Sequence, residues 1–248
     1  MNAVSMDADP TEQPRRAPRS RLILTVAMAF LAIVFAGLGT WQVKRLVWKL
    51  DIIERVEARV NGPPADAPSS PTRVTAESDE YRRVTATGVF RHDKEVQVQA
   101  VTALGAGFWV ITPLVRKDGT SVLVNRGFVP TDRRDPSSRV IGATGAPVRV
   151  TGLIRMPEPG GAFLRRNDPA NGRWYSRDVA AIAAVNDMPL ATDYFIDADA
   201  TPNPGGWPVG GLTVTRFRNN HLVYALTWYA LAIMSFAAAG AVRRGIFR

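Results

Sequence analysis

The sequence predicts a membrane protein in which one exported α+β domain, mainly antiparallel β and barrel- or sandwich-like, lies between two transmembrane helices. Three observations predict this fold class. The 22 residues from Leu22 to Val43 and the 24 from Asn219 to Val242 carry no charge. About 20 apolar residues at about 1.5 Å each span a hydrocarbon core of about 30 Å. The polar stretch between them is long enough to bury its own core and contains many short alternating runs.

Composition divides the chain into five segments. They are a disordered cytoplasmic tail (1–20), a first transmembrane helix (21–43), a periplasmic α+β domain (44–218, with a helical stalk 44–61 and a linker 62–80), a second transmembrane helix (219–242) and a cytoplasmic tail (243–248). The stalk is predicted from apolar residues at three- and four-residue steps, and the linker from its Pro, Ala and Ser content.

Arginines beside the two spans predict the orientation. Four lie between residues 15 and 21, and three between 243 and 248. By the positive-inside rule, both termini are cytoplasmic and the central domain is periplasmic, in the inner membrane of a bacterial cell. Lys44, Arg45 and Lys49 oppose this orientation, but long translocated domains obey the rule less. A cleaved signal peptide is the alternative for the first span, although Trp41 and Gln42 stand where a small-residue cleavage site is expected.

Composition also excludes several classes of function. The net charge is +9, yet no basic stripe with interleaved aromatic residues indicates a nucleic-acid partner. Cysteine is absent and the six Met are scattered, which disfavours thiolate metal sites and a copper carrier. The chain shows no Gly-x-Ser-x-Gly, His-Glu-x-x-His or phosphate-loop motif, so we expect no enzymatic activity.

Within the central domain, alternating runs predict seven strands, separated by turn signals and one helix. The candidate strands are Arg83–Phe90, Glu95–Val101, Phe108–Val115, Ser121–Val129, Val148–Arg155, Asp193–Ile196 and Leu212–Arg218. The helix is predicted over Arg177–Asn186, and Asp118-Gly119 is a hairpin turn signal because both residues tolerate positive φ. The Pro- and Gly-rich segment Thr201–Gly211 is predicted to be a loop.

Three motifs occur in order on this two-anchor chain. They are Gly39-Thr40-Trp41-Gln42-Val43-Lys44-Arg45 at the end of the first span, Asn125-Arg126-Gly127-Phe128-Val129-Pro130 after the hairpin, and Asn220-His221-Leu222-Val223-Tyr224-Ala225-Leu226-Thr227-Trp228 at the start of the second span. Together they closely resemble the surfeit locus protein 1 family. The family usually has Trp where this chain has Phe128, a change from one aromatic residue to another.

The resemblance implies a function in oxidase maturation. Family members are assembly factors for haem–copper terminal oxidases, above all cytochrome c oxidase, and some bacterial members are thought to bind and pass on haem a. The implied partners are the catalytic subunit of the oxidase, other assembly factors and membrane lipid. An alternative keeps the oxidase role without haem, as a scaffold that holds an oxidase subunit during assembly.

His221 is the residue that best fits a haem iron ligand. Neutral imidazole is a common axial ligand, and at helical spacing Tyr224, Ala225 and Trp228 share its face. A lipophilic haem would reach this face from the bilayer. The alternative is an interfacial His among the Tyr and Trp residues that membrane proteins place at the headgroup level.

Residues at the outer end of the first span complete the candidate cofactor site. Gly37 and Gly39 would let a helix or a flat ligand approach closely, and plain helix packing is the simpler explanation. Arg45 would lie on one face with Trp41 and Trp48, either to bind a propionate or to anchor the helix at lipid phosphates. Gln42 could form hydrogen bonds in either arrangement.

The central domain offers three further residues of interest. His92 precedes Asp93-Lys94 in a predicted turn, and we expect it to be a solvated surface residue. Arg126 is expected to form an internal ion pair, with a partner-facing role as the alternative. Gly127 is expected to supply an unusual backbone conformation.

Overall fold

The structure is a computed structural model that describes residues 18–69, 74–139, 145–162, 164–188, 190–215 and 217–246. It divides into two compact units. The helical unit comprises residues up to Ile52 together with those from Arg218 onward, and the β domain comprises Ile53–Phe217. Residues 1–17 of the predicted tail lie outside the described residues, whereas residues 18–20 already belong to the first helix.

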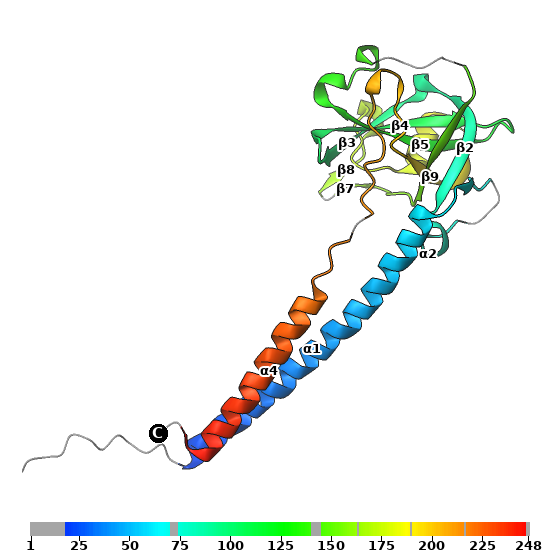
Figure 1. The fold of residues 1–248 in the computed structure, drawn as a ribbon. Helices are drawn as coiled ribbons and strands as arrows, with labels where there is room; N and C mark the ends of the chain where they lie inside the picture. Colours follow the sequence, from blue (N-terminus) through cyan, green and yellow to red (C-terminus); the bar gives the residue numbers. More distant parts are fainter. Residues whose placement is uncertain are drawn as a thin grey trace, which may run out of the picture. The chain divides into compact units, whose positions relative to one another are not determined.

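Two helices near the ends of the chain are long and apolar enough to cross a membrane. Helix α1 (Pro18–Asn61) is continuous, so the predicted first span and the predicted stalk form one helix. Helix α4 (His221–Arg244) ends at Gly245, whose φ of 71° gives a left-handed cap for the last turn. In the helical unit α4 runs alongside α1 (Figure 1).

Small residues fill the interior of the helical unit. The buried positions are Ala32 and Gly39 on α1 and Ala225, Ala232 and Ala239 on α4, each seven residues from the next on its helix. Large apolar side chains point outward instead; Ile33 is 72% exposed and Phe236 is 74% exposed. Helices that pack in lipid use small residues at their contacts in this way, because lipid already solvates the large ones.

The β domain is built on a seven-stranded mixed sheet (Figure 1). Its strands are β1 (Ala65–Asp66), β2 (Arg83–Phe90), β3 (Val96–Thr102), β4 (Gly105–Val115), β5 (Ser121–Pro130), β6 (Val148–Arg155) and β9 (Leu190–Ala198). They are ordered β1-β2-β6-β9-β5-β4-β3. A separate hairpin pairs β7 (Gly161–Ala162) with β8 (Arg165–Arg166), and the short helices are α2 (Ala76–Asp79) and α3 (Val179–Val185).

Most pairs in the main sheet are antiparallel, as predicted, but β1–β2 and β5–β9 are parallel. A further contact joins Val89 and Phe90 at the end of β2 to Val115 and Leu114 of β4, which brings non-neighbouring strands of the order together. The domain is therefore a mixed sheet with an additional pairing. The predicted barrel or sandwich stays a prediction.

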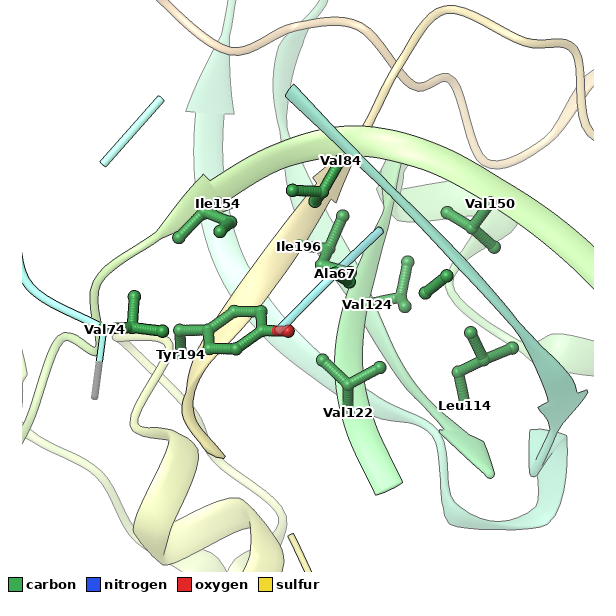
Figure 2. Packing of buried hydrophobic residues seen from close by; sticks show 11 residues of the cluster. Ala67, Val74, Val84, Leu114, Val122, Val124, Val150, Ile154, Tyr194 and Ile196 are labelled. Atoms are coloured by element: carbon green, nitrogen blue, oxygen red, sulfur yellow. The ribbon is translucent and has the colours of Figure 1, made fainter. Parts of the chain in front are cut away.

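A cluster of aliphatic side chains and Tyr194 forms one core of the domain. Figure 2 shows its members converging from β2, β4, β5, β6 and β9. They are Ala67, Val74, Val84, Ala86, Leu114, Val122, Val124, Val150, Ile154, Tyr194 and Ile196. A second cluster packs Val179 and Ile182 of α3 against Trp174 and Phe195. Alternate side chains of a strand point to opposite faces, so Tyr194 and Ile196 of β9 pack in the first cluster and Phe195 packs in the second.

The structure corrects several predictions for the domain. The predicted strand Leu212–Arg218 is wrong, because its described residues are irregular and form no β pairing with another strand. The predicted linker 62–80 contains β1 and α2, whose two- and four-residue lengths leave too little periodicity to detect. The predicted helix 177–186 is the shorter α3, since Asp178 caps it by accepting a hydrogen bond from the Ala181 N–H at 3.1 Å.

Candidate functional site

A hydrogen bond joins the first residue of α4 to the middle of α1. Nδ1 of His221, the first residue of α4, lies 2.7 Å from Oε1 of Gln42 on α1. An amide oxygen only accepts hydrogen bonds, so in the neutral imidazole this contact places the proton on Nδ1 and leaves the lone pair on Nε2. The backbone N–H of His221 also donates to Oδ1 of Asn219 at 3.3 Å. This environment fixes the tautomer in which Nε2 is free to bind a metal or accept a proton.

An aromatic pair lies two turns deeper along the same pair of helices. The rings of Phe35 and Trp228 stack with centroids 5.7 Å apart and planes 25° from parallel. Phe35 lies seven residues before Gln42, and Trp228 seven residues after His221, so each residue of this pair shares a helix face with one partner of the hydrogen bond. The hydrogen bond and the stacked rings therefore lie along one line of contact between α1 and α4. This line is polar at the start of α4 and apolar two turns further along.

Gly39 occupies a different contact of the two helices. A Cβ added to Gly39 would lie 2.8 Å from the ring of Tyr229, so the glycine makes room for that side chain. The Tyr229 hydroxyl lies 3.1 Å from the Thr40 hydroxyl. Helix packing, the simpler of the two explanations for Gly39, therefore accounts for this residue. Gly37 has no atom within 4 Å of the position where its Cβ would be.

The remaining candidate residues lie on exposed surfaces. Tyr224, one turn from His221, is 54% exposed, and Trp41 is 53% exposed. Arg45 places its guanidinium 4.5 Å from the Trp48 ring centroid, a cation–π contact that agrees with their predicted common face. Trp41 is two residues from the buried Gly39, so it faces away from α4. The structure thus brings His221 and Gln42 together with Trp228 two turns along α4, whereas Gly39 contacts Tyr229 and Arg45 contacts Trp48.

Sequence reasoning missed Phe35, Thr40 and Tyr229. The missed signal is a seven-residue step. Seven residues separate Phe35 from Gln42 and His221 from Trp228. The same step separates successive buried Ala and Gly positions on each helix. A step of seven residues returns to nearly the same face of a helix, so it marks where two helices meet.

His92 is not the solvated residue that we predicted. Its ring is half-buried in a short 3₁₀ turn, packs against Phe90 at 5.6 Å between centroids, and places Nδ1 3.3 Å from Nη1 of Arg126. Burial first, and then the charge of Arg126, lower the pKa of His92 below its ordinary value. Residues 34 positions away in sequence create this environment, which the neighbouring Asp93 and Lys94 could not indicate.

The predictions for Arg126 and Gly127 are confirmed. The buried guanidinium of Arg126 lies 3.9 Å from the Glu95 carboxylate. Gly127 has φ of 130°, and a Cβ there would collide with the backbone oxygen of Val209. The neighbouring Phe128 exchanges two backbone hydrogen bonds with Val209, each 2.9 Å, so the glycine allows a loop to pair with β5.

These features define a class of protein: a β domain joined to two helices that are long and apolar enough to cross a membrane. The model of the SURF1 family matches residues 29–233. Surfeit locus protein 1 of Mus musculus is 37% identical over 226 residues, which cover 85% of this chain and 70% of the relative. The human protein of the same name is 34% identical over 222 residues, 83% and 72% of the two chains.

A third relative is matched over most of its own length. The SURF1-like protein of Monosiga brevicollis is 37% identical over 231 residues, which cover 88% of this chain and 87% of the relative. This chain belongs to the SURF1 family, as the three sequence motifs predicted.

Proposed function

We propose that this protein is a membrane-bound assembly factor for a haem–copper terminal oxidase, foremost cytochrome c oxidase. We further propose that it holds haem a at His221 for delivery to the catalytic subunit. Membership of the SURF1 family supports the oxidase role. The hydrogen bond between His221 and Gln42 is the observation that carries the haem proposal.

The residues at this position fit a haem ligand. With its proton on Nδ1, His221 offers the Nε2 lone pair that axial ligation requires. A hydrogen-bond acceptor on the other ring nitrogen orients a ligating imidazole and raises its basicity, and Gln42 supplies this acceptor. Tyr224 and Trp228 would supply aromatic surface beside the ring.

Haem a is cargo in this proposal, and the chain performs no reaction on it. One histidine supplies one axial ligand, so the other position would stay open or be filled by a second copy of the chain or by the oxidase subunit. His221 is the only histidine of the whole sequence outside the β domain. The role of the remaining side chains is to orient the imidazole and to cover one side of the ligand.

An absorption spectrum tests the haem proposal. The full chain is purified in detergent from cells that make haem a, alongside His221→Ala and the matched control His92→Ala, which removes the other histidine. We expect a haem a band in the wild type and in His92→Ala, and at least a tenfold smaller band in folded His221→Ala. Gln42→Leu should retain less haem than the wild type, because the ring loses its orienting acceptor.

A spectrum without haem would favour the scaffold function. If folded wild-type protein carries no haem a band, the haem proposal fails. Co-purification of an oxidase subunit with haem-free protein would then support a scaffold. Equal haem content in wild type and folded His221→Ala would remove His221 as the ligand.

We also propose that the two helices cross the bacterial inner membrane with the β domain in the periplasm. The absence of cysteine permits a direct test by single-cysteine labelling. Lys117→Cys in the exposed hairpin turn should react with a membrane-impermeant maleimide in spheroplasts. Arg244→Cys should react only after the membrane is permeabilised. The opposite pattern would reverse the orientation.

A further inference from the structure

The β domain contains a cavity whose chemistry differs from that of the helical unit. Its volume is about 260 Å³, just below the range of about 300–1,000 Å³ that is usual for small-molecule sites. Strands β2, β5, β6 and β9, the 3₁₀ turn that begins at His92, the residues just before β6 and the loop after β9 supply its lining. Phe90, Val124, Val148 and Val150 make one part of the wall apolar. The cavity is therefore an extension of the core described above, in which Val124 and Val150 take part.

A buried cation points into this cavity. Arg126 follows Val122 and Val124 at two-residue steps on β5, so all three share the face that lines the core. Only 6% of the Arg126 surface is exposed. Nη2 donates to the Oδ1 atom of Asn203 at 3.1 Å, and Nη1 lies 3.3 Å from Nδ1 of His92. Its Nε has no hydrogen-bond partner among the described residues.

The nearest carboxylate is already used by another arginine. Glu95 accepts hydrogen bonds from both terminal nitrogens of Arg139, at 2.5 and 3.3 Å. Arg126 lies farther from the same carboxylate, at 3.9 Å. Two buried guanidinium groups thus share one buried carboxylate. An uncompensated buried charge destabilises a fold, so an anion in the cavity would stabilise this arrangement.

The other polar groups of the cavity lie at more exposed positions. Arg149 is exposed, and the half-buried carboxylate of Asp199 lies 3.9 Å from Arg83. The donor Nη1 of Arg126 faces Nδ1 of His92, which assigns the hydrogen of the neutral imidazole to Nε2. Arg126 and His92 therefore line the cavity with hydrogen-bond donors, and the charge of the neighbouring Asp93 also acts on His92. This set of donors suits one carboxylate better than a doubly charged phosphate, which needs more cationic donors.

We propose that this cavity binds a small organic acid, with its carboxylate at Arg126 and His92 and its apolar part along Val124, Val148 and Val150. The volume admits a ligand of the size of a short-chain fatty acid. This site lies wholly within the β domain and does not depend on haem binding at His221.

The two histidines of the chain provide an internal comparison for the test. Full-length protein labelled with ¹⁵N at histidine is titrated in detergent with hexanoate, and His221→Ala assigns the two sets of NMR signals. We expect hexanoate to shift the His92 signals saturably and to leave those of His221 unchanged. Hexanol, which lacks the charge, and inorganic phosphate, which lacks the apolar part, should give no saturable shift.

Two variants test the two halves of the site. Arg126→Gln removes the cation, and Ala198→Leu fills the cavity without touching a charge, since the half-buried Ala198 is part of the lining. Each should raise the Kd for hexanoate at least tenfold, whereas the exposed control Arg133→Gln should leave the Kd unchanged. If Arg126→Gln does not fold, the Kd of Ala198→Leu for hexanoate tests the proposal.

Three results would overturn the proposal. The first is the absence of a saturable shift of the His92 signals in the wild type. The second is an unchanged Kd in a folded variant of Arg126 or Ala198. The third is an equal response to phosphate, which would show a general anion site.

Discussion

The helical unit and the β domain bury side chains of opposite size. In the helical unit the interior positions hold alanine and glycine, and large apolar side chains such as Ile33 and Phe236 face outward. In the β domain the most deeply buried side chains are large, including Tyr194, Phe128 and Phe195, and charged groups such as Asp197 are buried with them. This difference is the one expected of a chain whose helical unit lies in lipid, as proposed above, and whose β domain lies in water.

Each pattern of burial has its own energetic origin. In water, burying apolar area stabilises a fold by about 25 cal/mol per Å², so the β domain gains most from large side chains inside. In a lipid bilayer, the outward-facing side chains of a helix are already in an apolar medium. Close packing and hydrogen bonds, such as the one between Gln42 and His221, must then hold the helices together.

The largest expected effect comes from adding one methyl group to Gly127 of the β domain. Gly127→Ala places a side chain at φ of 130° against the fixed backbone of Val209 and Gly210, and the loop that pairs with β5 must move. We expect a loss of about 4 kcal/mol or more in the free energy of unfolding, measured by denaturant titration of tryptophan fluorescence. The control Gly119→Ala, in an open turn at φ of 82°, should cost about 1–2 kcal/mol.

A smaller but still large effect is expected at Asp197. Its carboxylate accepts hydrogen bonds from Asn125 at 2.8 Å, Thr213 at 3.0 Å and Arg177 at 3.2 Å. Asp197→Ala would remove the acceptor of the buried Asn125 and of the half-buried Thr213 and Arg177, so we expect a loss of about 3 kcal/mol in the same unfolding measurement. The exposed Asp93, which pairs with Arg91, is the control, and Asp93→Ala should change stability little. Equal losses in the two variants would contradict this view of the β domain.

The matching glycine substitution in the helical unit should cost less. Gly39→Ala brings a methyl group to 2.8 Å from the Tyr229 ring, and a ring at the edge of a contact can rotate where a backbone cannot. We expect weaker helix pairing by about 1 kcal/mol. The measurement is disulfide formation between cysteines placed at Gln42 and His221, which should be slower in the Gly39→Ala background. Gly37→Ala, with open space around it, should leave the rate unchanged.

The smallest effect concerns the titration of His92. We expect NMR titration to give it a pKa below 6.5, because burial first and Arg126 second oppose protonation. Arg126→Gln should raise this pKa by removing the positive neighbour. Since the unfolded chain binds the proton more readily, His92 lowers the stability of the fold as pH falls through about 6.5 toward its folded pKa. A pKa at or above 6.5 in the folded protein would show that the ring is solvated after all.

Local patterns predicted much of the β domain. The alternation of Arg83–Phe90 predicted β2 with its observed bounds, and the turn at Asp118-Gly119 forms with φ of 82° at the glycine. Residues 212–218 alternate too, yet their described part forms no strand, because alternation gives the side-chain period of a strand and does not supply the partner strand. The local sequence also could not predict the parallel pairing of β5 with β9, because this pairing joins segments that lie far apart in the chain.

For the candidate haem site, the sequence by itself determined the residue types and their helices. An uncharged stretch long enough to span a bilayer is a local property, and so is the position of His221 at its start. Only the tertiary structure decided that Gln42 contacts the imidazole, that Gly39 makes room for the Tyr229 ring, and that Arg45 lies against Trp48. The physical reason is that the rotation of one helix against another depends on contacts between residues 179 positions apart, which periodicity along one helix does not encode.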